Sequence, residues 1–234
     1  RIAVANTRND LLAVLDPQGR AERVFAGSGK ADGALDDPEG VAFSAQRRLY
    51  VADRGNSRVA VYSEFGVFLH AIGLSMDPAT ALVKPYRVAI DGAERVYVLE
   101  DVSSGRISVF SHAGKLLARL TTESVPGSQS ARWRALAVDH GGRLFVADTA
   151  NGNIVEIDWE RGQVRRRFGS PGTGRGQFED IVALAISGRE LAIADAGNKK
   201  IEFFRLPEAQ SAATQAERLP SVRRGSTASL ESCR

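Results

Sequence analysis

The stretch RLYVADRGNSRVAVYSEFG, residues 48–66, decides the fold, because its pattern returns along the chain. Two short apolar runs, residues 49–52 and 59–62, flank a polar turn, and a glycine closes the stretch. This arrangement predicts a β-hairpin. Further copies read IAVANTRNDLLAVLD, VYVLEDVSSGRISVFS, LFVADTANGNIVEID and LAIADAGNKKIEFF. The residue that opens each turn recurs in register, at Asn6, Asp53, Asp101, Asp148 and Asp195.

Each repeat contains more than the hairpin. A glycine follows 13 or 14 residues after each of the first four turn residues and suits a second hairpin leading to a third strand. A linker rich in Gly and Pro then leads into a further strand, as in GVAF at residues 40–43. Four short strands in a period near 47 residues are typical of a β-propeller. We therefore predict an all-β fold, a β-propeller of four-stranded antiparallel blades over residues 1–206, with five repeats visible and 18 strands.

The second repeat carries the resemblance to a known family. DPEGVAF at residues 37–43 and RLYVADRGNSRV at residues 48–59 resemble the NHL repeat family. The third repeat departs from that pattern at KPYRVAI, and the next two have Trp133 and Ile181 where the family has Pro. The resemblance implies a six-bladed ring, which at this period needs about 282 residues. We expect residues 1–206 to form an arc of such a ring; a smaller ring closed with the tail is the alternative.

Composition limits the class of protein. The 234 residues are 43% hydrophobic and 25% charged, as in an ordinary soluble globular protein, and the formal net charge of +3 is weak support for a nucleic-acid partner. No apolar run approaches the ~20 residues that span a bilayer, so we expect no membrane insertion. The single cysteine, Cys233, leaves no internal disulfide or cysteine metal cluster and is compatible with the cytoplasm. No signal-peptide pattern opens the sequence, and the compartment stays open.

The last 28 residues, 207–234, break the pattern, and their composition predicts a flexible tail. Within it RRGSTAS places two arginines before Ser226, a setting that basophilic kinases prefer. Ser226 is therefore a candidate phosphorylation site.

The repeats carry no recognisable catalytic set. The three histidines, His70, His112 and His140, fall at three different phases of the repeat and cannot converge on a propeller axis. The glycine-rich segments at 27–33 and 169–177 lie between blades and precede no helical pattern, so neither predicts a phosphate loop. We expect no catalytic residue, metal or cofactor in the visible blades.

The NHL resemblance also implies where chemistry would lie. Its amidating lyase branch binds zinc through histidines that follow the Pro of the repeat, near the axis. Those positions here hold Glu39, Tyr86, Arg134 and Val182, so that zinc site is missing from the visible blades. A calcium-dependent lactonase would need several axial oxygen ligands, and only Glu39 offers one.

A loop face remains as the candidate site. The hairpin turn and the linker before the first strand of each blade lie at the same end of a propeller, so polar and aromatic side chains gather there. We predict a non-catalytic recognition or scaffold module that binds a protein or peptide partner through this face. Single-stranded RNA binding is one alternative; a metal-dependent lyase or lactonase with its key residues outside these blades is the other. The candidate binding residues are Glu39, Arg54, Tyr86, Arg87, Arg106, Arg132, Trp133, Arg134 and Lys199.

Overall fold

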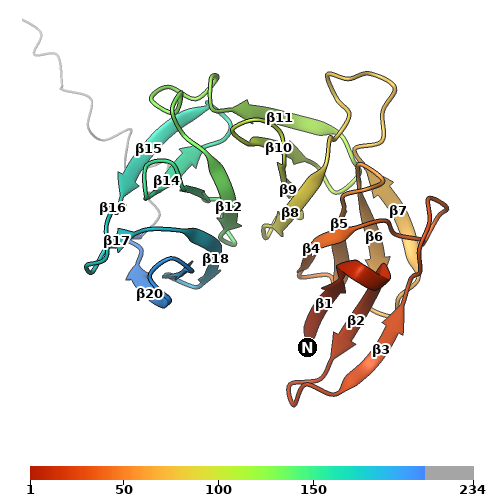
Figure 1. The fold of residues 1–234 in the computed structure, drawn as a ribbon. Helices are drawn as coiled ribbons and strands as arrows, with labels where there is room; N and C mark the ends of the chain where they lie inside the picture. Colours follow the sequence, from red (N-terminus) through yellow and green to blue (C-terminus); the bar gives the residue numbers. More distant parts are fainter. Residues whose placement is uncertain (209–234) are drawn as a thin grey trace, which may run out of the picture.

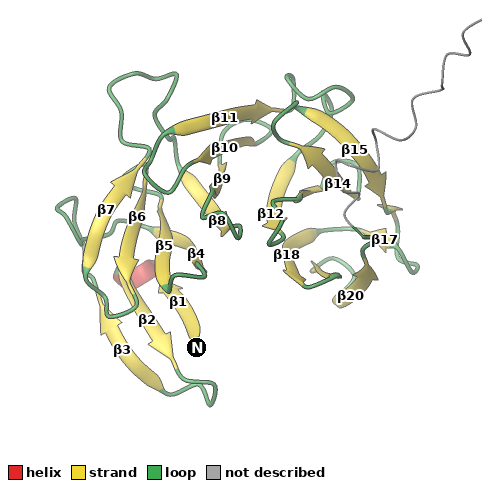
Figure 2. Cartoon of the chain, turned by 180° about the vertical axis from the view of Figure 1, so that it is seen from behind, coloured by secondary structure: helices red, strands yellow, loops and turns green. Residues whose placement is uncertain are grey.

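The computed structural model describes residues 1–208 and confirms the predicted all-β propeller architecture. Five antiparallel blades follow one another around an arc, with the first and the last blade at its two ends (Figure 1). Seen from behind, strands β3, β7, β11 and β15 form the outer rim of the arc, while β1, β4, β8, β12 and β18 line its inner side (Figure 2). The candidate phosphorylation site Ser226 lies outside the described residues.

Three blades are complete, with four strands each in chain order from the inner side to the rim. The alternating or continuous apolar runs of the repeat form these strands, and the polar turns join them. The second blade contains β4 (Pro38–Phe43), β5 (Arg48–Asp53), β6 (Arg58–Ser63) and β7 (Phe68–Ile72). The third contains β8 (Pro85–Ile90), β9 (Val96–Glu100), β10 (Arg106–Phe110) and β11 (Leu116–Thr121). The fourth contains β12 (Trp133–Val138), β13 (Leu144–Asp148), β14 (Asn153–Asp158) and β15 (Gln163–Phe168).

The two end blades have three strands each. The first contains β1 (Ile2–Asn6), β2 (Leu11–Leu15) and β3 (Ala21–Phe25), with the short 3₁₀ turn η1 (Thr7–Asn9) in its first hairpin. The last contains β18 (Ile181–Ser187), β19 (Glu190–Asp195) and β20 (Lys200–Arg205). The five blades thus hold the 18 strands that the repeat predicts, and a short parallel pair, β16 (Ser170–Pro171) and β17 (Gln177–Phe178), is added in a linker.

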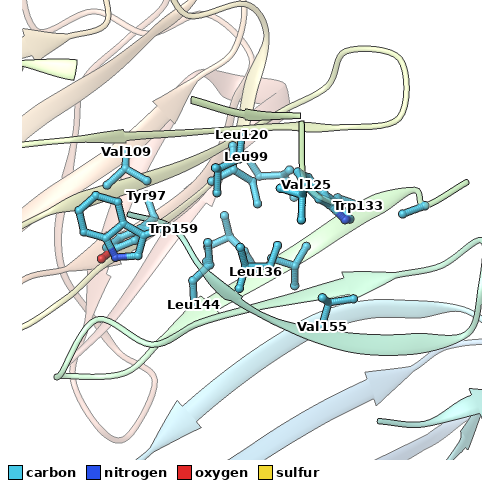
Figure 3. Packing of buried hydrophobic residues seen from close by; sticks show 14 residues of the cluster. Tyr97, Leu99, Val109, Leu120, Val125, Trp133, Leu136, Leu144, Val155 and Trp159 are labelled. Atoms are coloured by element: carbon cyan, nitrogen blue, oxygen red, sulfur yellow. The ribbon is translucent and has the colours of Figure 1, made fainter. Parts of the chain in front are cut away.

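The hydrophobic core is divided among the interfaces between successive blades. Four apolar clusters fill the four interfaces, and the largest lies between the third and fourth blades (Figure 3). It contains the fully buried Leu99 and Val155 and the almost fully buried Trp133. Burying a side chain of this size contributes roughly 1.5–3 kcal/mol. Each blade is therefore stabilised mainly by its neighbours.

Close approach of the blades near the axis explains one glycine of the repeat. A Cβ atom on Gly40 would lie 2.9 Å from both the Cα of Arg87 and the carbonyl oxygen of Tyr86 in the next blade. No side chain fits there without moving the backbone. The glycine of the Pro-x-Gly motif thus permits the inner strands β4 and β8 to pack together.

The asparagine of the hairpin turn has a structural role. Asn56, Asn151 and Asn198 each precede the residue that adopts left-handed backbone, at Ser57, Gly152 and Lys199. The asparagine side chains donate hydrogen bonds to the buried acid that precedes them: the amide nitrogen of Asn56 lies 2.9 Å from Oδ2 of Asp53.

Candidate functional site

The acid at the first hairpin of each of the last four blades is a structural clamp, a buried carboxylate that binds the preceding linker. Asp53 is fully buried, and its carboxylate accepts hydrogen bonds from the side chains of Asn56 (2.9 Å) and Arg58 (2.7 Å). Its other oxygen accepts the backbone N–H of Asp36, 2.8 Å away in the preceding linker. Both carboxylate oxygens accept hydrogen bonds from the fold, so neither is free to perform chemistry.

The same clamp repeats in the next three blades. Glu100, Asp148 and Asp195 accept backbone N–H groups of the preceding linker at 2.7, 3.0 and 2.9 Å. In the third blade the sequence reading was wrong by one residue: Glu100, not Asp101, pairs with Arg106 across the hairpin and is fully buried. The longer side chain of Glu100 takes the place of the aspartate, and Asp101 is released to the surface, where its carboxylate meets Arg54.

The environment of the clamp changes its ionisation. Burial between two neighbouring blades raises the pKa of Asp53 despite its hydrogen bonds. Burial also acts to raise the pKa of Asp195, but hydrogen bonds from Asp180, Asn198 and Glu179 outweigh it and lower that pKa. Both carboxylates are buried, at 0% and 1% exposure, but Asp195 lies in the last blade, one face of which has no neighbouring blade among the described residues, so desolvation acts on it less strongly.

β-bulges place the residues that lie nearest the axis. Each inner strand of the last four blades shifts register against its partner near its first residue. Bulges of this kind redirect side chains and are frequent beside active sites. The extra residues include the four positions that follow the Pro of the repeat or its replacement, namely Glu39, Tyr86, Arg134 and Val182.

Contacts between blades join three of these positions. The Tyr86 hydroxyl donates to the carbonyl oxygen of Arg134 at 2.6 Å, and burial raises the pKa of Tyr86 to about 12. The Arg87 guanidinium lies 4.9 Å from the centre of the Tyr86 ring and 3.7 Å from the carboxylate of Glu39. Glu39 and Arg87 thus form a partly exposed ion pair between two blades. The Tyr86 ring packs against Arg87, and its hydroxyl group links the third blade to the fourth.

The structure divides the remaining predicted binding residues into two groups. Trp133 is 1% exposed and belongs to the core, Arg106 pairs with the buried Glu100, and Arg54 bridges Asp37 and Asp101. These three side chains hold blades and linkers together. In the described part of the chain, three cations of the loop face have no acidic partner within ion-pair distance: Arg132, Arg134 and Lys199.

A second concave region lies at the opposite end of the strands and was missed from the sequence. It is a cavity of about 430 Å³ whose lining includes Arg95, Arg143, Glu156, Trp159 and Arg166. Glu156 is only 5% exposed and pairs with Arg166. The sequence offers one signal for this site. Glu156 stands at the repeat position that is Val61 in the second blade and Val109 in the third, where a charged residue is unusual.

The fold is that of a β-propeller, and three of the four bulge positions on the inner side of its blades, Glu39, Tyr86 and Arg134, carry polar side chains. The NHL repeat family matches residues 35–62, which confirms the resemblance carried by the second blade. No curated protein matches the chain in sequence. Among the described residues no group of His, Cys, Asp or Glu could hold a metal ion, and no helix there is long and apolar enough to cross a membrane.

Solved structures with a similar fold include several lyases. Virginiamycin B lyase from Staphylococcus aureus has a TM-score of 0.56 at 10% identity, over 88% of this chain and 67% of that chain. A streptogramin B lyase structure has 0.56 at 14% identity, over 88% and 65%. Hydrazine synthase from Kuenenia stuttgartiensis has 0.56 at 12% identity, over 87% and 79%. The chain therefore spans about two thirds of the lyase chains, and at these identities the likeness shows the fold alone.

Proposed function

We propose that this propeller is a recognition module that binds a protein or peptide partner through its loop face, with an acidic group of the partner against Arg132 and Arg134. The observation that carries the proposal is the division of the cations on this face. Arg54, Arg87 and Arg106 already pair with carboxylates, whereas Arg132 and Arg134 have none within ion-pair distance among the described residues. Both flank the inner end of the fourth blade, so two guanidinium groups are available to a ligand there.

The fourth blade is favoured over the last blade by local charge. Lys199 also lacks an acidic partner in the described part of the chain, but the linker before β18 carries the exposed Glu179 and Asp180. Their carboxylates partly cancel its field. We therefore assign the acidic contact to Arg132 and Arg134.

The aromatic residues argue against the RNA alternative. Base stacking needs an exposed aromatic ring. Trp133 is 1% exposed, and the Tyr86 hydroxyl is bound inside the protein. The lyase alternative rests on fold similarity to enzymes of low identity, and the four bulge positions supply one carboxylate and no imidazole.

A selection of displayed random peptides on the purified chain tests the proposal. We expect acidic sequences to be enriched and to lose about tenfold or more in affinity for the Arg132→Ala, Arg134→Ala variant, since each charge-assisted contact is worth 1.5–3 kcal/mol. The matched control removes two exposed arginines remote from the face, Arg20 and Arg161. Peptides without acidic enrichment, or equal binding to both variants, would contradict the proposal.

A further inference from the structure

The cavity of about 430 Å³ lies at the end of the strands away from the loop face, and the fourth blade forms most of its wall. Its lining comes from the hairpin between β12 and β13, from the second half of β14, from the turn after it and from β15. Arg95 of the third blade and the pair Pro207 and Glu208 complete it, and no residue of β18, β19 or β20 takes part. Volumes of ~300–1,000 Å³ are typical of sites for small molecules.

Glu156 is the buried charge of this cavity, with 5% exposure. Arg166 lies opposite it in register on β15 and is its ion-pair partner. The Nε–H group of Arg166 is nevertheless buried without a hydrogen bond among the described residues. A buried carboxylate needs hydrogen bonds to its oxygens to offset the loss of hydration. Both members of this pair therefore have hydrogen-bonding capacity that the described residues leave unused.

Asp158, two residues further along β14, lines the same cavity but is fully bound. Its carboxylate accepts the backbone N–H of Arg161 at 3.2 Å, and the guanidinium groups of Arg161 and Arg165 each donate to it at 2.9 Å. Burial acts to raise the pKa of Asp158, but these hydrogen bonds outweigh it and lower that pKa. The contrast singles out Glu156 as the buried acid of this cavity that is open to a ligand.

Two further arginines of the cavity are held in place by their own hairpins. Arg95 donates from Nε to Asp91 at 2.5 Å, and Arg143 donates from Nε to Asp139 at 2.6 Å. The other end of the Arg143 guanidinium faces the cavity, since its Nη1 donates to the carbonyl oxygen of Pro207 at 2.9 Å. A guanidinium group fixed in this way loses little conformational entropy when it binds a ligand.

One aromatic ring brings the cations together. Phe145 of β13 lies opposite Glu156 in register, and its ring centre is 5.8 Å from the guanidinium carbon of Arg143 and 6.0 Å from that of Arg166. Two guanidinium groups and one buried carboxylate therefore converge on the same part of the fourth blade.

The balance of charge decides the class of ligand. Each guanidinium group of the lining already has a carboxylate partner, in the pairs Arg95–Asp91, Arg143–Asp139, Arg165–Asp158 and Arg166–Glu156. An anion would meet balanced cations and the buried Glu156, and a cation would meet the guanidinium groups. A hydroxyl group suits both, because it donates one hydrogen bond and accepts others. The lining therefore favours a neutral ligand that carries several hydroxyl groups.

We propose that this cavity binds a neutral sugar or a similar polyol. One hydroxyl group of the ligand donates to the carboxylate of Glu156, and a neighbouring hydroxyl accepts from Arg166 or Arg143. Adjacent hydroxyl groups of one ring suit a carboxylate and a guanidinium that lie side by side. This site lies at the other end of the strands from the loop face and does not rest on the function proposed for that face.

The probes are D-glucose, D-galactose, D-mannose and myo-inositol, each titrated into the full chain, with inorganic phosphate and methylammonium as charged comparators. Trp159 lines the cavity and is 9% exposed, so its fluorescence should report binding, whereas Trp133 is 1% exposed in a blade interface. Saturation-transfer NMR of the probes measures the same binding without the tryptophan signal.

We expect at least one neutral probe to bind with a Kd of about 10 mM or tighter, and both charged comparators to bind about tenfold or more weakly. Glu156→Gln should weaken the neutral probe by about tenfold or more, since it removes a charge-assisted hydrogen bond at nearly constant shape. The same variant leaves Arg166 without its carboxylate, so it should bind phosphate about threefold or more tightly than the unsubstituted chain does.

Two control variants separate loss of the site from loss of the fold. Glu156→Val introduces the residue that the second and third blades carry at this place, Val61 and Val109, so it should keep the fold and lose the sugar. Its denaturation midpoint measures the first, and NMR the second. The Arg132→Ala, Arg134→Ala variant, changed in the loop face, should bind the sugar within about twofold of the unsubstituted chain.

Three results would overturn the proposal. The first is that no neutral probe binds with a Kd of about 10 mM or tighter, which would mean that water or the chain itself fills the cavity. The second is equal affinity of the neutral probe for the unsubstituted chain and the Glu156→Gln and Glu156→Val variants. The third is tighter binding of phosphate or methylammonium than of every neutral probe, which would assign the cavity to a charged ligand. None of these outcomes bears on the loop face.

Discussion

The second and the last blade are built from the same repeat but differ in how much of it is covered. Val59 and Val61 of β6 are fully buried, whereas Ile201 and Phe203, at the equivalent places of β20, are 64% and 68% exposed. The second blade has a neighbour on each side, whereas within residues 1–208 the last has the fourth blade alone beside it (Figure 1). The comparison teaches that in this fold an apolar residue is made a core residue by the adjacent blade, and not by its own strand.

The buried clamp should show the largest difference between these two blades. Asp53→Ala leaves Arg58 buried without its carboxylate, with 4% of the side chain exposed, and should cost about 3–5 kcal/mol of unfolding free energy. Asp195→Ala removes hydrogen bonds in a more solvated blade and should cost about 1–3 kcal/mol. Urea denaturation of both variants measures the two losses. Equal losses would mean that the last blade is covered as fully as the second.

A smaller contrast is expected for the apolar faces. Val61→Ala should cost about 2 kcal/mol, because a fully buried side chain leaves a cavity. Phe203→Ala deletes a larger group but should change the free energy of unfolding by no more than about 0.5 kcal/mol, since its ring faces solvent. The midpoints of urea denaturation measure both changes, provided that the variants keep the same dependence of the unfolding free energy on urea concentration. A loss of more than about 1.5 kcal/mol for Phe203→Ala would show that something covers this face.

The smallest effect concerns acid. The pKa of Asp195 is lowered in the folded state, so its contribution is present above the ordinary aspartate pKa of about 3.9 and is lost as pH falls through the folded value. The pKa of Asp53 is raised, so its contribution has the opposite sign and is lost as pH rises through its folded value. Stability measured from about pH 6 to pH 3 for Asp195→Asn and Asp53→Asn, each against the unsubstituted chain, should show differences that drift in opposite directions. Parallel drifts would contradict the assignment.

The repeat made most of the fold predictable, because phase alone fixes strand number, strand order and the position of each hairpin. It failed at Glu100, where a one-residue shift in the hairpin let a glutamate replace the expected aspartate. It also offered Trp133 as a surface anchor, although this residue begins an inner strand and turns into the blade interface. Sequence gives the period of a strand, but which of its faces meets another blade depends on neighbours distant in the chain.

The cavity was harder to predict for the same reason. Glu156 stands in the alternating run NIVEID, where a charged residue ordinarily predicts a solvent-facing position. Its burial goes with its ion pair to Arg166 of β15, in a cavity that Arg95 of the third blade and Pro207, beyond the last blade, also line. No local pattern contains that information.

The clamp that ties each linker to its hairpin has a consequence for how freely this protein can diverge. The four buried acids bind the linkers through the main-chain amides of Asp36, Val83, Arg132 and Asp180, which are three different kinds of residue: acidic, apolar and basic. A hydrogen bond from a backbone N–H group does not depend on which side chain the residue carries. The linker side chains, and with them the surface that each blade offers, can therefore change by mutation while a single acid in each of the last four blades keeps the architecture in place.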